Sequence, residues 1–146
     1  MFDDEYYMRK ALAEAEEALR EGEIPVGAVV VSRGMIIAKA HNMTERLVDV
    51  TAHAEMLALT AAERWLGGKY LSGCTLYVTV EPCVMCAGAL SWSQIERVVY
   101  GASDEKRGYT VYAPGALHAK TQVTAGVLAD ECSGLMKDFF KGKRSK

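Results

Sequence analysis

Hydrophobic residues recur along the chain at two spacings, which predict strands in alternation with helices. Stretches rich in β-branched, aromatic and other apolar residues predict five strands, at 26–31, 35–40, 75–80, 98–101 and 122–124. Apolar positions three or four residues apart predict four helices, from Asp3 or Asp4 to Arg20, over 52–66, from Cys83 onward, and over 128–141. The glycine- and proline-containing stretch 103–120 predicts a loop with one helical turn.

This order of elements predicts a single α/β domain over residues 1–146. A strand that is followed by a helix and another strand forms a parallel pair, and the helices cover both faces of the sheet. The first two strands flank Arg33 and Gly34, which predicts a hairpin and one antiparallel neighbour. We therefore expect a three-layer α/β/α sandwich around a mixed, mostly parallel five-stranded sheet.

Two cysteines follow the predicted central strand, at the start of a helix. Pro82 suits the first turn of a helix, and Cys83 and Cys86 then share one face of that turn. The unpaired N–H groups of the turn favour negative charge, which makes both thiols easier to ionise. Two thiolates at this spacing form half of a metal site. A CxxC motif taken alone is equally typical of a redox pair or a structural clip.

His53 supplies a third ligand to this site. Thr51 is the expected N-cap of the helix over 52–66, which puts His53 in the first turn of that helix. One imidazole and two thiolates make three protein ligands, the number found in a catalytic zinc site, where water takes the fourth position. Glu55 is then the expected general base and general acid for that water. HxE followed by PCxxC is the signature of the zinc deaminases.

A zinc ion that only joins two helices is the competing interpretation of these residues. Structural zinc normally has four protein ligands, so this interpretation requires that the fold bring Cys74 or His118 to the site. Cys74 and Cys132 are otherwise expected to be buried, inert thiols. Met85 and Trp92, close to the cysteines in sequence, are expected to pack inside the protein.

The motifs HAE at 53–55 and EPCVMCAGA at 81–89 resemble those of the cytidine-deaminase-like superfamily. Within it, the stretches at 24–31, 50–55, 97–108 and 126–132 closely resemble bacterial tRNA adenosine deaminases, and the resemblance covers residues 6–143. It implies a cytidine deaminase-like fold, one zinc ion per subunit and a homodimer. It also implies that adenosine at the wobble position of a tRNA anticodon stem-loop is converted to inosine by hydrolysis.

Four substrate contacts follow from the resemblance alone. It implies that the amide of Asn42 binds the nucleoside, that Val26 lies against the base, that the backbone N–H of Ala54 contacts the substrate and that Asp104 lies in a substrate-side loop. From the residue types alone, Asn42 is equally a turn residue, Val26 and Ala54 are core residues, and Asp104 belongs to a charged turn. The alternative function is deamination of a free base such as guanine. Val26 favours adenosine, because guanine-deaminase-like sequences more often carry an aromatic residue there.

Composition and charge place few limits on this prediction. The chain has 146 residues, of which 50% are hydrophobic and 25% charged, the composition of an ordinary globular domain. It contains no apolar run near the ~20 residues of a membrane span, and its cysteines form no secreted disulfide framework, so we expect a cytoplasmic protein without a membrane anchor. The net charge of −2 does not indicate a nucleic-acid binder. A basic C-terminal tail fits either a phosphate backbone or water, and it comprises Lys137, Lys141, Lys143, Arg144 and Lys146.

Overall fold

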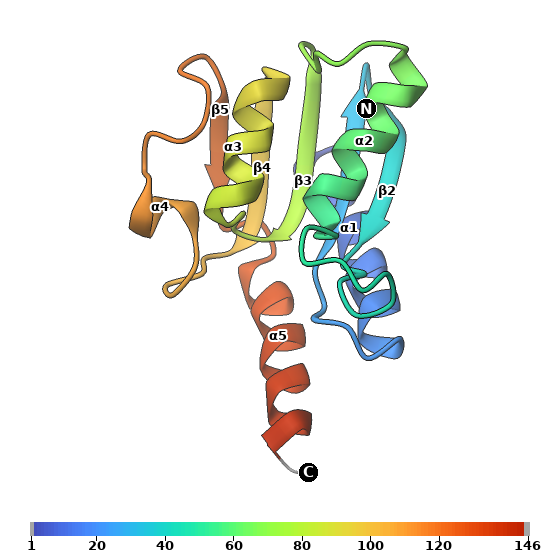
Figure 1. The fold of residues 1–146 in the computed structure, drawn as a ribbon, viewed down its shortest axis with the longest axis vertical. Coiled ribbons are helices and arrows are strands. Elements are labelled where there is room, and N and C mark those ends of the chain that lie inside the picture. The colour runs from blue at the N-terminus through green and yellow to red at the C-terminus, as the bar shows by residue number, and fades with distance from the viewer. Residues whose placement is uncertain (1, 145–146) are drawn as a thin grey trace.

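A five-stranded sheet with the order β2-β1-β3-β4-β5 forms the centre of the computed structural model, which describes residues 2–144 (Figure 1). The strands are β1 (Gly27–Ser32), β2 (Met35–His41), β3 (Cys74–Val80), β4 (Arg97–Ala102) and β5 (Gln122–Ala125). β1 pairs antiparallel with β2 and with β3, whereas β3 with β4 and β4 with β5 pair parallel. Four strands therefore run in one direction and β1 opposes them, which confirms the mixed, mostly parallel sheet.

Helices cover both faces of this sheet. They are α1 (Asp4–Arg20), α2 (Ala54–Leu66), α3 (Val84–Ser93), the single turn α4 (Tyr109–Tyr112) and α5 (Ala129–Arg144). The apolar side chains of α2 and α3 join one core cluster, and those of α1, together with Cys132 of α5, join a second. Because the two clusters contain alternate residues of the central strands, they lie on opposite faces of the sheet, and the predicted three layers are confirmed.

Strand β3 shows how the sequence pattern produces this arrangement. Every residue of β3 except Thr75 is buried. Leu76 and Val78 belong to the cluster beneath α2 and α3, whereas Tyr77 belongs to the cluster beneath α1. A strand covered on both faces is mostly apolar, as the run at 75–80 is, and its one buried polar residue, Thr79, accepts a hydrogen bond from the N–H of Gly27.

The start of α2 differs from the prediction. Thr51 is not the N-cap: the N-cap is His53, and the helix begins at Ala54. Asp49 explains the shift, because its Oδ1 accepts hydrogen bonds from both the backbone N–H and the hydroxyl of Thr51, at 2.8 Å each. This local turn holds the chain out of the helical conformation for two further residues.

The cysteine helix begins in the same way as α2. Cys83 is the N-cap of α3 and not a residue of its first turn. Neither the imidazole of His53 nor the thiol of Cys83 makes a capping hydrogen bond to its helix. Both side chains therefore remain available to a ligand outside the helix.

Two further expectations are resolved by burial. Cys74 and Cys132 are buried thiols, as predicted. The expectation that Met85 and Trp92 pack inside is wrong: Trp92 is 85% exposed and Met85 37% exposed, because both project from the side of α3 that faces away from the sheet. None of the helices within residues 2–144 is both long and apolar enough to cross a membrane.

Candidate active site

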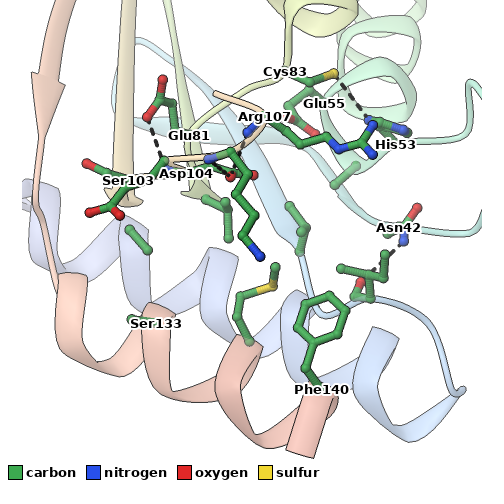
Figure 2. A pocket seen from close by; sticks show the side chains of 18 of the residues that line it. Asn42, His53, Glu55, Glu81, Cys83, Ser103, Asp104, Arg107, Ser133 and Phe140 are labelled. Carbon is green, nitrogen blue, oxygen red and sulfur yellow. Dashed lines mark hydrogen bonds between the residues drawn. The ribbon is translucent and has the colours of Figure 1, made fainter. Parts of the chain in front are cut away.

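The three predicted metal ligands converge where α2 and α3 begin. Nδ1 of His53 lies 3.6 Å from Sγ of Cys83 (Figure 2). It lies 3.5 Å from Sγ of Cys86. The ligand atoms of the three residues all lie within 4.8 Å of one another, and no other His, Cys, Asp or Glu of residues 2–144 completes such a group. Neither Cys74 nor His118 belongs to it, so the fourth protein ligand that a structural zinc requires is not supplied by either residue.

Electrostatics at this site favour a cation. Hydrogen bonds from the Cys86 thiol and from His53 lower the pKa of Cys83 to about 4. The hydrogen bond to Cys83 in turn raises the pKa of His53. A thiolate is therefore favoured at Cys83, whereas the hydrogen bond to Cys83 and burial raise the pKa of Cys86, so the expectation of easier ionisation holds for only one of the two thiols. Two sulfur atoms and one imidazole nitrogen are a donor set that Zn²⁺ prefers, and the residues present fit that ion.

Glu55 is the second residue of α2 and lies beside the three ligands (Figure 2). Its side chain is 4% exposed. Burial raises the pKa of its carboxyl group to about 7, from an ordinary value of 4.5. A carboxyl group with a pKa near neutrality can both accept and donate a proton under physiological conditions, which is the requirement for a general base and acid.

A cavity of about 990 Å³ opens in front of these residues. Its walls come from the start of β1, the loop after β2, the starts of α2 and α3, the loop after β4 and the side of α5 (Figure 2). The predicted site residues that line it are Val26, Asn42, His53, Ala54, Glu55, Cys83 and Asp104. Helix α5 extends beyond the end of the sheet and borders the cavity with Met136, Lys137, Phe140 and Lys143 (Figure 1).

Two of the predicted substrate contacts also hold the backbone. The amide of Asn42, 5% exposed, donates to the carbonyl of Ile24 at 3.3 Å and accepts from the N–H of Thr44 at 3.3 Å. Oδ1 of Asp104 accepts from the N–H groups of Lys106 and Arg107, at 3.1 and 2.9 Å. Both residues therefore shape loops that border the cavity, as their residue types alone suggested.

The sequence analysis missed two buried carboxylates that anchor the loops around the cavity. Glu23 accepts hydrogen bonds from the backbone of the loop after β2, and Glu81 from the backbone of the loop after β4. Each stands next to an apolar motif, before Ile24 and after Val80. Neither position carries a local signal of this role, because the donors that each carboxylate meets lie 22 to 29 residues away along the chain.

Known proteins place the chain in a family. Residues 1–102 match the family described as the cytidine and deoxycytidylate deaminase zinc-binding region. The tRNA-specific adenosine deaminase of Bacillus subtilis (strain 168) is 46% identical over 151 residues, which cover 100% of this chain and 94% of the relative. That of Aquifex aeolicus (strain VF5) is 47% identical, over 97% of this chain and 96% of the relative. The chain belongs to the bacterial tRNA-specific adenosine deaminases.

Solved structures of the deaminase family have the same fold. One comes from a study of A-to-I editing by tRNA:A34 deaminases at the wobble position of transfer RNA. It has a TM-score of 0.84 and 41% identity, and the match covers 89% of this chain and 98% of that one. The guanine deaminase of Nitrosomonas europaea also has a TM-score of 0.84, with 29% identity over 95% of this chain and 85% of that one. Membership in this deaminase family makes the protein a zinc-dependent enzyme.

Proposed function

We propose that this protein deaminates adenosine to inosine at the wobble position of a tRNA anticodon, with one zinc ion held by His53, Cys83 and Cys86. The observation that carries the proposal is the convergence of these three residues on the buried carboxylate of Glu55 in one cavity. Identity of 46% and 47% to tRNA-specific adenosine deaminases along the chain supports the substrate.

Glu55 moves the protons of the reaction. His53, Cys83 and Cys86 would hold the zinc ion, which would lower the pKa of a water molecule toward neutrality and so make it the nucleophile. Glu55 accepts a proton as the water oxygen bonds to the carbon that bears the exocyclic amine, and it passes this proton to the adjacent ring nitrogen. It then transfers the remaining proton of the new hydroxyl group to the amine. The carbon–nitrogen bond breaks, ammonia leaves, and the carbonyl group of inosine remains.

The part of the cavity wall that contains Val26 and Asn42 provides the contacts to the nucleoside. Val26 and Asn42 lie together there, because the N–H of Asn42 donates to the carbonyl of Val26 at 3.0 Å. Val26 offers an apolar face to the base, and the neighbouring Asn42 offers an amide that can both donate and accept. Ala54 is the first residue of α2, so its N–H points toward the cavity side of the helix N-terminus.

Basic side chains surround the mouth of the cavity and suit an RNA backbone. Lys106 and Arg107 stand on one side, and Lys137 and Lys143 stand on α5. These four cations outnumber the acidic Asp104 and Glu105 of the same loop and favour a polyanionic substrate, although the whole chain is slightly acidic. Lys146 of the predicted basic tail lies outside the described residues. An anticodon loop presents bases that are already partly unstacked, so moving one into the cavity costs little free energy.

Inosine formation in a defined RNA tests this proposal. The zinc-loaded protein is incubated separately with an anticodon stem-loop that contains a wobble adenosine and with free guanine. We expect inosine in the RNA and no product with the Glu55→Ala variant. Conversion of guanine while the RNA stays unchanged would favour the activity named for the Nitrosomonas europaea relative.

We also propose that the protein is a cytoplasmic homodimer that associates through α3 and α4. These neighbouring helices expose apolar side chains, among them Trp92 at 85%, Tyr112 at 69% and Val111 at 51%. Exposed apolar patches of this kind mark interfaces between proteins. Light scattering coupled to size-exclusion chromatography should give the mass of a dimer for the native protein and of a monomer for Trp92→Glu. A monomeric native protein would refute the proposal.

A further inference from the structure

Glu81 is a buried carboxylate that takes no part in the chemistry proposed above. It follows β3 directly and is 5% exposed. Its Oε1 accepts a hydrogen bond from the N–H of Asp104 at 3.1 Å (Figure 2). Its Oε2 accepts two more, from the N–H of Thr110 at 3.1 Å and from the hydroxyl of Thr110 at 2.7 Å. Three donors from a distant stretch of chain therefore meet on one carboxylate.

The chain between Asp104 and Thr110 encloses this carboxylate. A Cβ atom on Gly108 would lie 2.2 Å from Oε2 of Glu81, although the φ of −61° at Gly108 suits any residue. The carboxylate, together with the carbonyl oxygen of Asp104 at 2.6 Å, therefore excludes a side chain there, whereas the φ angle does not. Two backbone contacts complete the enclosure: Gly108 forms a β-bridge with Cys83, and the N–H of Tyr109 donates to the carbonyl of Pro82 at 2.9 Å.

The enclosed loop is also a wall of the cavity. Asp104, Lys106 and Arg107 all line it, and Oδ1 of Asp104 holds the N–H groups of the other two. Figure 2 shows the side chain of Arg107 extending across the cavity toward His53 and Glu55. Hydrogen bonds thus connect Glu81, two residues before the metal ligand Cys83, through Asp104 to the backbone of Lys106 and Arg107 in the cavity wall.

We infer that Glu81 is a positioning residue that holds the loop 103–110 against the metal-binding turn and thereby sets the affinity for the RNA substrate. The inference rests on the proposed function. Glutamate is required at this position, because both of its carboxylate oxygens accept hydrogen bonds. Glutamine has only one acceptor oxygen, and its NH₂ group would face either the N–H of Asp104 or the two donors of Thr110. Loss of the contact leaves the metal ligands and Glu55 in place and frees the wall that bears Lys106 and Arg107. Binding of RNA should therefore weaken more than the chemical step.

The test measures RNA binding and turnover separately. The variants Glu81→Ala, Glu81→Gln and Thr110→Val are made in the full chain, loaded with zinc and assayed with the wobble-adenosine stem-loop. The dissociation constant of a fluorescent stem-loop is measured in the Glu55→Ala background, where no product forms. Asp4→Asn is the control, because it removes an ion pair to Arg97 between α1 and β4 without altering any residue of the cavity wall.

We expect Glu81→Ala to raise Kd and KM about tenfold, with kcat within about twofold of native and one zinc ion per chain. Glu81→Gln and Thr110→Val, which keep part of the contact, should raise Kd about threefold. The control should lower the melting temperature and leave Kd unchanged. If Glu81→Ala does not fold, the Kd values of Glu81→Gln and Thr110→Val test the inference, because both are expected to rise.

Three results would overturn the inference in distinguishable ways. If the native protein binds RNA and all three variants bind it with native affinity, the positioning role is refuted and the proposed function stands. The positioning role is likewise refuted if kcat falls in proportion to lost zinc while Kd stays native, since Glu81 then acts only on the metal site. If the native protein neither binds nor deaminates the stem-loop, the proposed function is refuted, and the role of Glu81 in RNA affinity falls with it.

Discussion

Replacement of Glu23 should destabilise the protein, because this residue ties the loop after β2 to the end of α1. Glu23 is 1% exposed. Its Oε1 accepts from the N–H of Glu45 at 3.0 Å, and its Oε2 accepts from the N–H of Arg46 at 2.8 Å. The same loop joins Asn42 to His53, so the contact also fixes the path of the chain into the metal site.

The two oxygen atoms of Glu23 give the size of the effect. In Glu23→Gln one of the two backbone N–H groups loses its acceptor and faces an NH₂ group, which costs about 1–3 kcal/mol. In Glu23→Ala both backbone N–H groups lose their acceptor and a small cavity remains, so the cost in free energy of unfolding rises to about 3–5 kcal/mol. For a domain of this size 1 kcal/mol corresponds to about 2–4 °C in Tm, and Glu23→Gln should therefore melt about 2–12 °C below the native protein.

Thermal and urea denaturation at a fixed zinc concentration measure this difference, since bound metal itself shifts stability. Glu5→Gln is the matched control: its side chain is 56% exposed and contacts Arg9 one helical turn away, so it should change stability by less than about 0.5 kcal/mol. Hydrogen exchange at the N–H of Arg46 should accelerate in Glu23→Gln and not in the control. Equal stability of the two variants would refute the role given to Glu23.

Three further predictions concern the site and the N-terminal helix. Glu55→Gln should lower kcat by about 10²–10⁴-fold while zinc content stays at one per chain, as measured by inosine release and metal analysis; retained turnover would contradict it. Cys86→Ala should lose both zinc and activity after dialysis, and full metal content would argue against Cys86 as a ligand. Asp4→Asn should lower the free energy of unfolding by about 2 kcal/mol at pH 7 in urea titrations, because it removes the half-buried pair with Arg97. The Arg97 guanidinium lowers the pKa of Asp4 below 3.8, so this stabilisation is present above about pH 4 and disappears as the pH falls through the folded-state pKa. If the free energies of unfolding of the native protein and of Asp4→Asn still differ at lower pH, that assignment is contradicted.

Local signals in the sequence predicted most of the fold. Asp3 caps α1, and Gly67 ends α2 in a left-handed conformation, because both functions depend on one residue and its immediate neighbours. The metal ligands were predictable for a related reason: Cys83 and Cys86 are fixed by their spacing, and His53 is marked by Glu55 two residues later.

Contacts between residues that are distant along the chain could not be predicted from the sequence. Glu81 meets donors that are 23 and 29 residues away, and Glu23 meets donors 22 and 23 residues away, so no short pattern reveals either carboxylate as an anchor. The prediction that Trp92 is packed inside the protein failed for a different reason. An apolar residue in a helix is normally packed, and its exposure on α3 could not be recognised before the orientation of that helix was known.

The central claim is that this site hydrolyses the amine of a wobble adenosine. The most direct measurement is the reaction of zinc-loaded native protein with the anticodon stem-loop in oxygen-18-labelled water, followed by digestion and mass spectrometry of the nucleosides. The account predicts inosine at the wobble position with one labelled oxygen, one ammonia released per inosine, and neither product from Glu55→Ala. Unchanged adenosine in the RNA, with no labelled oxygen in its nucleosides and no ammonia released, would contradict it.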